Sequence, residues 1–117
     1  MVPLAVPVAR VVRPPAAYVV VGARHVPLAV SSWCWRRRCG APIAASGRAV
    51  VLRRKGTVRV RLGFAAATAQ VAVAGLRVRV SRSGSVLSWR ATRPGGMTIH
   101  VTSRRGWVVY VGRLVLR

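Results

Sequence analysis

The chain has 117 residues, 53% of them apolar, and it carries twenty arginines and one lysine but no aspartate or glutamate. The apolar content is too high for a disordered polycation, and the length suits one domain. Without carboxylates there can be no side-chain salt bridge, no paired-carboxylate glycosidase chemistry and no oxygen-ligated magnesium or calcium site. His25 and His100 also lack the acidic group that orients a catalytic base. We therefore expect a protein that is not an enzyme and that has no catalytic residue, metal or cofactor.

The first fifteen residues are rich in proline. Prolines at this density prevent a regular helix and a central strand, so residues 1–15 are expected to form an extended lead-in and residues 16–117 a single domain. Arg10 and Arg13 interrupt the apolar run well before the roughly 20 residues needed to cross a bilayer. Residues 1–9 do not form a good secretory signal, because no basic residue precedes the apolar stretch; the alternative is that they are the end of a signal peptide that starts upstream.

From residue 16 onward, short apolar segments alternate with glycine or proline turns. In residues 57–63 and 76–80, Val and Leu alternate with arginine, which is the period of a strand with one buried and one exposed face. Lys55-Gly56 and Pro94-Gly95-Gly96 are turn sequences. The expected strand segments, in chain order, are residues 16–21, 25–30, 48–54, 57–63, 69–74, 76–80, 85–91, 97–102, 107–111 and 113–116.

Valine is the dominant apolar residue, with 24 copies. Its stiff, branched side chain favours strands over helices, and no segment has a sustained helical period. Many short strands separated by regular turns are typical of a sandwich or a barrel. The sequence therefore predicts an all-β fold, namely a small immunoglobulin-like antiparallel β-sandwich, with a small β-barrel as the alternative.

Cys34 and Cys39 are the only two cysteines. Their spacing does not match a redox Cys-x-x-Cys motif, but it allows a disulfide that closes a short loop and stabilises the fold by roughly 2 kcal/mol. A disulfide would indicate an oxidising compartment, and two reduced thiols in a cytoplasmic protein are the alternative. A zinc site that adds His25 and His100 lacks the spacing of a zinc finger.

The loop between the cysteines is the first candidate site. If Cys34 and Cys39 are bridged, Arg36, Arg37 and Arg38 lie at the loop tip. Trp33 and Trp35 then share one face of the strand that leads into the loop, either as aromatic contacts for a ligand or as cover for the core. Guanidinium groups beside aromatic rings suit a membrane interface, a phosphate-bearing polymer or a single-stranded nucleic acid.

Two pairs of arginines on strands form the second candidate surface. Arg59 and Arg61, and likewise Arg77 and Arg79, should each project from one face, about 6.6 Å apart along the strand. Like charges on facing strands would oppose pairing unless a polyanion were bound. The alternative is that these arginines form an ordinary solvated face.

Three segments of the chain have a recognisable pattern: Pro14-Pro15-Ala16-Ala17-Tyr18, Ser32-Trp33-Cys34-Trp35 with Cys39, and a hairpin over Val51 through Phe64. Together they resemble a family of uncharacterised secreted or lipid-anchored domains of Gram-positive bacteria. The resemblance covers residues 14 to 117 and implies secretion and a β-sandwich, but no known activity. The chain departs from this family at Gly40-Ala41 and at Arg105-Gly106-Trp107, where the family has acidic residues. Residues 94–101 are similar to the late turn and strand of immunoglobulin-like sandwiches.

The formal charge of +21 indicates an anionic partner. Self-repulsion opposes compaction, and arginine cannot lose its proton to relieve it. We expect an exported or envelope-associated domain that binds an anionic polymer or lipid headgroups without catalysis. The alternative is a nucleic-acid-binding module without sequence specificity, since no recognition helix is visible. No small-molecule substrate is expected.

Codon composition offers a different explanation for the missing acids. Only six residues of the chain belong to the group whose codons carry A in the second position, which includes Asp and Glu. GC-rich codon usage or an unintended reading frame would produce the same deficit. A structural domain without a ligand, or a frame that is not expressed, therefore stands as the third possibility, although regularly spaced turns favour a real fold.

Overall fold

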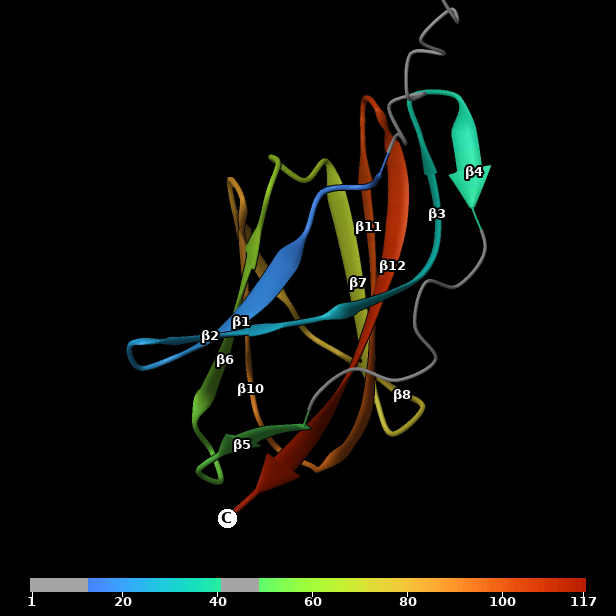
Figure 1. The fold of residues 1–117 in the computed structure, drawn as a ribbon. Coiled ribbons are helices and arrows are strands. Elements are labelled where there is room, and N and C mark those ends of the chain that lie inside the picture. The colour runs from blue at the N-terminus through green and yellow to red at the C-terminus, as the bar shows by residue number, and fades with distance from the viewer. Residues whose placement is uncertain (1–12, 41–48) are drawn as a thin grey trace, which may run out of the picture.

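A computed structural model describes residues 13–40 and 49–117, and it confirms the all-β prediction. Two sheets pack face to face to form a sandwich (Figure 1). Residues 13–16 lead into the first strand without regular structure, and residues 1–12 of the expected lead-in lie outside the described residues. None of the described residues lies in a helix that could cross a membrane.

The first sheet has five antiparallel strands in the order β2-β1-β6-β10-β9. Strand β6 lies in the middle because it pairs with β1 on one side and with β10 on the other. The bounds are β1 (Ala17–Val21), β2 (Arg24–Pro27), β6 (Thr57–Leu62), β9 (Ser81–Ser83) and β10 (Val86–Arg90).

The second sheet has seven strands, six of them in the order β4-β3-β12-β11-β7-β8. The seventh, β5, pairs in parallel with the C-terminal part of β12, whereas the other pairs are antiparallel. The bounds are β3 (Ala29–Trp35), β4 (Arg38–Gly40), β5 (Ala49–Leu52), β7 (Thr68–Val73), β8 (Leu76–Val78), β11 (Gly95–Ser103) and β12 (Gly106–Leu116).

This strand order matches that of immunoglobulin domains. The order β1-β6-β10-β9 corresponds to the A-B-E-D sheet, and β12-β11-β7-β8 corresponds to G-F-C-C′ of the variable type. The hairpin β3–β4 is an additional element that extends the second sheet beyond β12. The prediction of an immunoglobulin-like sandwich is confirmed, and the barrel alternative is wrong because two separate sheets are present.

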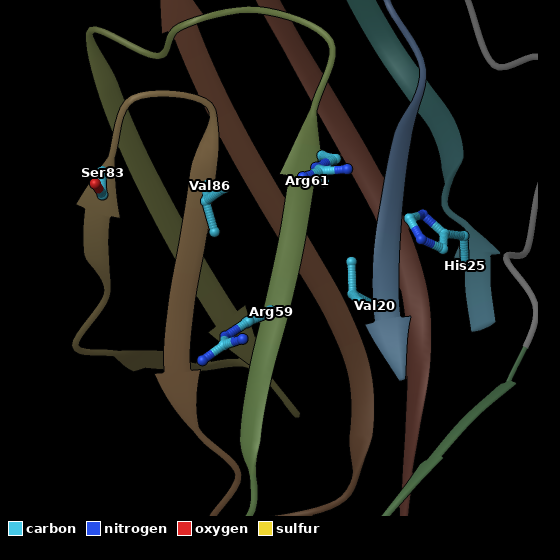
Figure 2. A pocket seen from close by; sticks show the side chains of 6 residues that line it. All are labelled: Val20, His25, Arg59, Arg61, Ser83 and Val86. Atoms are coloured by element: carbon cyan, nitrogen blue, oxygen red, sulfur yellow. The ribbon is translucent and has the colours of Figure 1, made fainter. Parts of the chain in front are cut away.

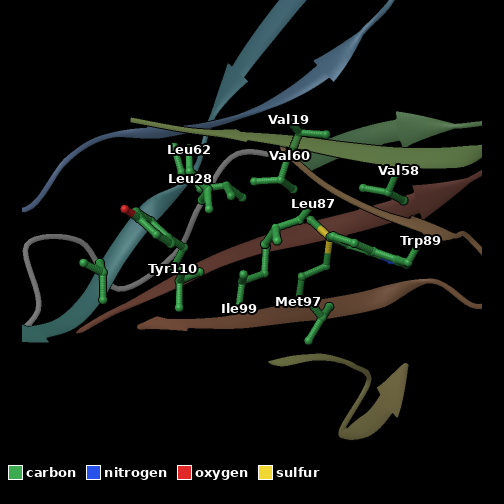
Figure 3. Packing of buried hydrophobic residues seen from close by; sticks show 14 of the residues in the cluster. Val19, Leu28, Val58, Val60, Leu62, Leu87, Trp89, Met97, Ile99 and Tyr110 are labelled. Carbon is green, nitrogen blue, oxygen red and sulfur yellow. The ribbon is translucent and has the colours of Figure 1, made fainter. Parts of the chain in front are cut away.

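Alternation along the strands builds the core between the sheets. In β6, Val58, Val60 and Leu62 are buried while Arg59 and Arg61 are exposed. The side chains meet in one cluster, in which those of the first sheet face Met97, Ile99 and Tyr110 of the second (Figure 3). The phenol of Tyr110 donates a hydrogen bond to the Pro15 carbonyl at 2.6 Å, so the end of the lead-in is fixed to the core.

Three sequence expectations about connections need correction. The segment 25–30 is not one strand: the chain passes from the first sheet to the second at Leu28, whose N–H donates to the Ala17 carbonyl at 2.9 Å. The hairpin that the family resemblance implied over residues 51–64 does not exist, because β5 and β6 belong to different sheets. Gly112 does not end a strand, because β12 continues through it and changes partner from β3 to β5.

Candidate functional site

The disulfide hairpin β3–β4 presents three of the candidate arginines. Cys34 and Cys39 lie directly opposite each other and are joined by a disulfide, as predicted. Arg36 and Arg37 form the turn with φ values of 49° and 66°, the left-handed conformation of a type I′ turn that usually contains Asn and Gly. Both side chains and that of Arg38 are exposed. The disulfide thus closes a hairpin that presents three cations, two of them in a turn whose backbone conformation is unfavourable for arginine.

A second arginine turn lies beside the first. Arg104 and Arg105 connect β11 to β12, and both are exposed. The Arg36 N–H donates to the Arg105 carbonyl at 2.8 Å, and Trp35 pairs with Gly106. We call Arg36, Arg37, Arg38, Arg104 and Arg105 the arginine cluster.

Gly106 allows the two turns to approach. Its φ is +144°, and a Cβ there would lie 1.9 Å from the Cys34 carbonyl oxygen, so only glycine fits. Sequence reasoning missed Arg104 and Arg105 because the strand pairing that brings them to the disulfide hairpin is distant in sequence. In the sequence, Gly106 follows Arg104 and Arg105 directly, and this glycine could have been used to predict a tight turn there.

An open depression of about 300 Å³ lies next to the arginine cluster. Trp35 and Phe64 are in contact there, with ring centroids 4.9 Å apart, and they form its aromatic part. Arg104, Arg105 and Ser103 supply hydrogen-bond donors at the same depression. This arrangement can take a flat or apolar group beside an anion.

The expected aromatic contacts, Trp33 and Trp35, need correction. Both side chains are buried, at 9% and 4% exposure, because they lie on the face of β3 that packs into the core. The Trp33 ring covers Gly40 on β4, where a Cβ would lie 2.5 Å from the indole. Trp33 therefore supports the hairpin and offers no ring face to a ligand, whereas Trp35 contributes only to the lining of the depression.

Arg59 and Arg61 lie on the outer face of the first sheet, as predicted. They line an open depression of about 480 Å³ together with side chains from four other strands (Figure 2). Those other side chains are Val20, His25, Ser83 and Val86.

Arg77 and Arg79 do not project from one face of a single strand, contrary to the expectation for residues 76–80. Arg77 lies on β8 in the second sheet and donates to the Gln70 side chain at 3.4 Å. Arg79 follows the end of β8, in the connection to β9. Arg77 belongs to the second sheet and Arg79 to a connection, so neither lies beside Arg59 and Arg61 on the first sheet.

The strand registers explain how the sandwich tolerates its charge. Arg59 lies opposite Val20 and Ser88, and Arg61 lies opposite Tyr18 and Val86. In each strand pair that the structure describes, every arginine has a neutral residue opposite it. Directly opposed like charges, the arrangement that most weakens strand pairing, are thereby avoided without any side-chain carboxylate.

Arg82 has a structural role that the sequence did not indicate. It lies on the edge strand β9, and its guanidinium donates to the carbonyls of Ala66 and Ala67 in the connection between β6 and β7. It thus ties the edge of the first sheet to a loop that leads into the second. The sequence gives no sign of which arginines bind a ligand and which stabilise the fold. Only the tertiary contacts show that Arg82 has the structural role.

The geometry offers little for metal binding. The disulfide removes both thiols from the zinc alternative, and His25 and His100 lie in different sheets. Over residues 13–40 and 49–117, no group of three or more potential ligands is placed to hold a metal ion.

Comparison of the chain with protein-family models, with curated proteins and with solved structures finds no match.

Proposed function

We propose that this protein is a non-catalytic, exported sandwich domain that associates with an anionic surface, either a polymer of the cell envelope or lipid headgroups. The arginine cluster is the contact region. The observation that carries the proposal is the juxtaposition of two arginine turns, joined by the hydrogen bond from Arg36 to Arg105, in a chain that has no side-chain carboxylate to neutralise them.

The physical argument concerns local charge density. Five exposed guanidinium groups on two adjacent turns repel one another, and a multivalent anion would convert that repulsion into attraction. Guanidinium binds phosphate and carboxylate oxygens in a bidentate fashion, so arginine suits such a surface better than lysine. The disulfide supports export, because such bonds persist in oxidising compartments.

Vesicle sedimentation tests the contact region. The protein is mixed with phosphatidylglycerol-containing vesicles and with vesicles of phosphatidylcholine alone, and we expect binding only to the former. Each arginine near an anionic membrane contributes about 1 kcal/mol, so Arg104→Gln/Arg105→Gln should weaken binding roughly thirtyfold. The matched control is Arg53→Gln/Arg54→Gln, which removes the same charge from the exposed connection between β5 and β6. Equal losses in both variants would refute the assignment to the arginine cluster.

Single-stranded nucleic acid is the second candidate, favoured by the half-buried Phe64 ring in the neighbouring depression. Salt weakens both kinds of binding, so a salt titration does not separate them. A competition experiment separates them. If an oligothymidylate displaces the protein from anionic vesicles at equal phosphate concentration, the result favours the nucleic-acid-binding function. Failure to displace it would favour the surface.

Mass spectrometry of the native protein tests export and expression together. Trypsin cleaves after Arg36 and Arg38, so the oxidised protein should give a peptide ending at Arg36 that is linked through Cys34–Cys39 to the peptide starting at Cys39. Reduction should separate the pair. Free thiols in the native protein would contradict export to an oxidising compartment, and the absence of any peptide from the organism would favour the unintended reading frame.

A further inference from the structure

The outer face of the first sheet carries a second site, separate from the arginine cluster. Its centre is β6, where Arg59 and Arg61 project from the same face about 7 Å apart. In Figure 2, Val20 on β1 and Val86 on β10 lie on the two sides of β6, and His25 and Ser83 lie on the outer strands. All five neighbouring strands of the sheet thus contribute to one depression.

The strand register fixes the arrangement of these side chains. Val20 lies directly opposite both His25 and Arg59, and Val86 lies directly opposite both Arg61 and Ser83. Neighbouring strands are about 4.8 Å apart, so the two valines lie between the arginines and the outer polar groups. The result is an apolar surface on each side of a central pair of guanidinium groups.

The volume and chemistry of the depression define the ligand. A volume of about 480 Å³ is in the range of small-molecule sites. Neither Arg59 nor Arg61 donates a side-chain hydrogen bond to any group among residues 13–40 and 49–117. A guanidinium group is a donor only, so a ligand bound by these two exposed groups would be rich in acceptors and negatively charged.

Phosphate fits better than carboxylate. The two guanidinium groups of Arg59 and Arg61 provide more donors than the two oxygens of one carboxylate can use. A phosphate monoester has three terminal oxygens that can accept from both arginines at once. Its organic part can then lie on Val20 or Val86, which would otherwise remain in contact with water.

We propose that the depression around Arg59 and Arg61 binds a small organic phosphate, with the phosphate between the two guanidinium groups and an apolar or aromatic group on the adjacent valines. This site goes beyond surface association and departs from the sequence expectation that no small molecule is bound. It does not depend on the arginine cluster, which lies on the turns of the second sheet.

The test is a two-dimensional amide NMR titration at physiological salt with phenyl phosphate, inorganic phosphate and benzoate as probes. Phenyl phosphate should bind about tenfold more tightly than either of the other probes, because only it offers both three acceptors and a ring. Its shifts should concentrate on the strands that carry His25, Arg59, Arg61, Ser83 and Val86. Shifts spread evenly over all arginine-bearing strands would overturn the proposal.

Variants separate the two parts of the site. Arg59→Gln/Arg61→Gln should weaken phenyl phosphate binding at least tenfold, since each charged hydrogen bond contributes substantially. Val86→Thr keeps the branched shape and should remove much of the advantage over inorganic phosphate. The charge-matched controls Arg53→Gln/Arg54→Gln and Arg104→Gln/Arg105→Gln should each change affinity less than about threefold. Equal losses in all three double variants would show binding by net charge alone and would refute this site without bearing on vesicle association.

Discussion

The turn of the disulfide hairpin contains two arginines in a conformation that asparagine and glycine adopt more easily. Arg36 and Arg37 have positive φ, and a non-glycine residue in the left-handed region is disfavoured by about 1–2 kcal/mol. Asn tolerates this region and Gly has no preference against it. Because the introduced glycine would also increase the entropy of the unfolded chain, we expect Arg36→Asn/Arg37→Gly to raise the free energy of unfolding by about 1 kcal/mol net.

The same substitution removes two positive charges next to Arg38, Arg104 and Arg105. Exposed like charges at such distances interact by a few tenths of a kcal/mol and are screened by salt. Arg36→Gln/Arg37→Gln removes the same charges but retains side chains that are disfavoured at positive φ. The difference between the two variants therefore isolates the backbone contribution.

Thermal unfolding followed by circular dichroism measures both effects at low and at physiological salt. For a domain of this size, 1 kcal/mol corresponds to a rise in Tm of roughly 4–8 °C. The rise relative to the Gln-Gln variant should persist at high salt, while vesicle binding should fall in both variants. An Asn-Gly variant no more stable than the Gln-Gln variant would refute the assigned turn geometry. An Asn-Gly variant that is more stable yet binds vesicles like the wild type would refute the role of this turn in binding.

Three further substitutions test the packing and the titration behaviour. Gly40→Ala places a methyl group in the Trp33 ring and should destabilise the domain by about 1–3 kcal/mol in urea unfolding, whereas Gly96→Ala, with open space around it, should not. Burial raises the pKa of Tyr110 above its ordinary value of 10.0, so its contribution to the free energy of unfolding should be fully present below pH 10 and fall as the pH rises further. In unfolding curves measured at alkaline pH, Tyr110→Phe should not show this decline. An unchanged decline would contradict the burial of Tyr110. Arg82→Gln should cost about 1–2 kcal/mol through its two carbonyl hydrogen bonds, and a loss no larger than that of Arg53→Gln would contradict that role.

Local pattern was sufficient to predict the class of fold and the orientation of side chains on β6, but it was wrong for residues 76–80, where Leu76 is exposed and the strand ends at Val78. The alternation of Val and Arg over residues 57–62 correctly assigned Val58 and Val60 to the core and Arg59 and Arg61 to the surface. A period of two is a property of a single strand, so neighbouring strands are not needed to detect it. The disulfide was predictable for the same reason, because its two cysteines are only five positions apart.

Strand partners could not be predicted in this way. The alternation in β5 and β6 gives no sign that these consecutive strands belong to different sheets, and Gly112 looked like a strand end although β12 passes through it. Pairing depends on contacts between distant segments, which the sequence near each strand does not encode. The burial of Trp33 could not be predicted for the same reason. Its ring covers Gly40 because β3 pairs with β4, and that pairing is a feature of the tertiary structure.

The sequence by itself determined that this protein has no Asp or Glu side chain, that it folds into strands and that its surface is cationic, because these properties depend on composition and on local period. Only the tertiary structure decided which arginines act together. Strand pairing brings Arg104 and Arg105 to the disulfide hairpin, assigns Arg59 and Arg61 to a depression of their own, and separates both from Arg77 and Arg79. The physical reason is that a site for an anion requires several donors within the reach of one ligand, and that proximity is set by the register of strands distant in the chain.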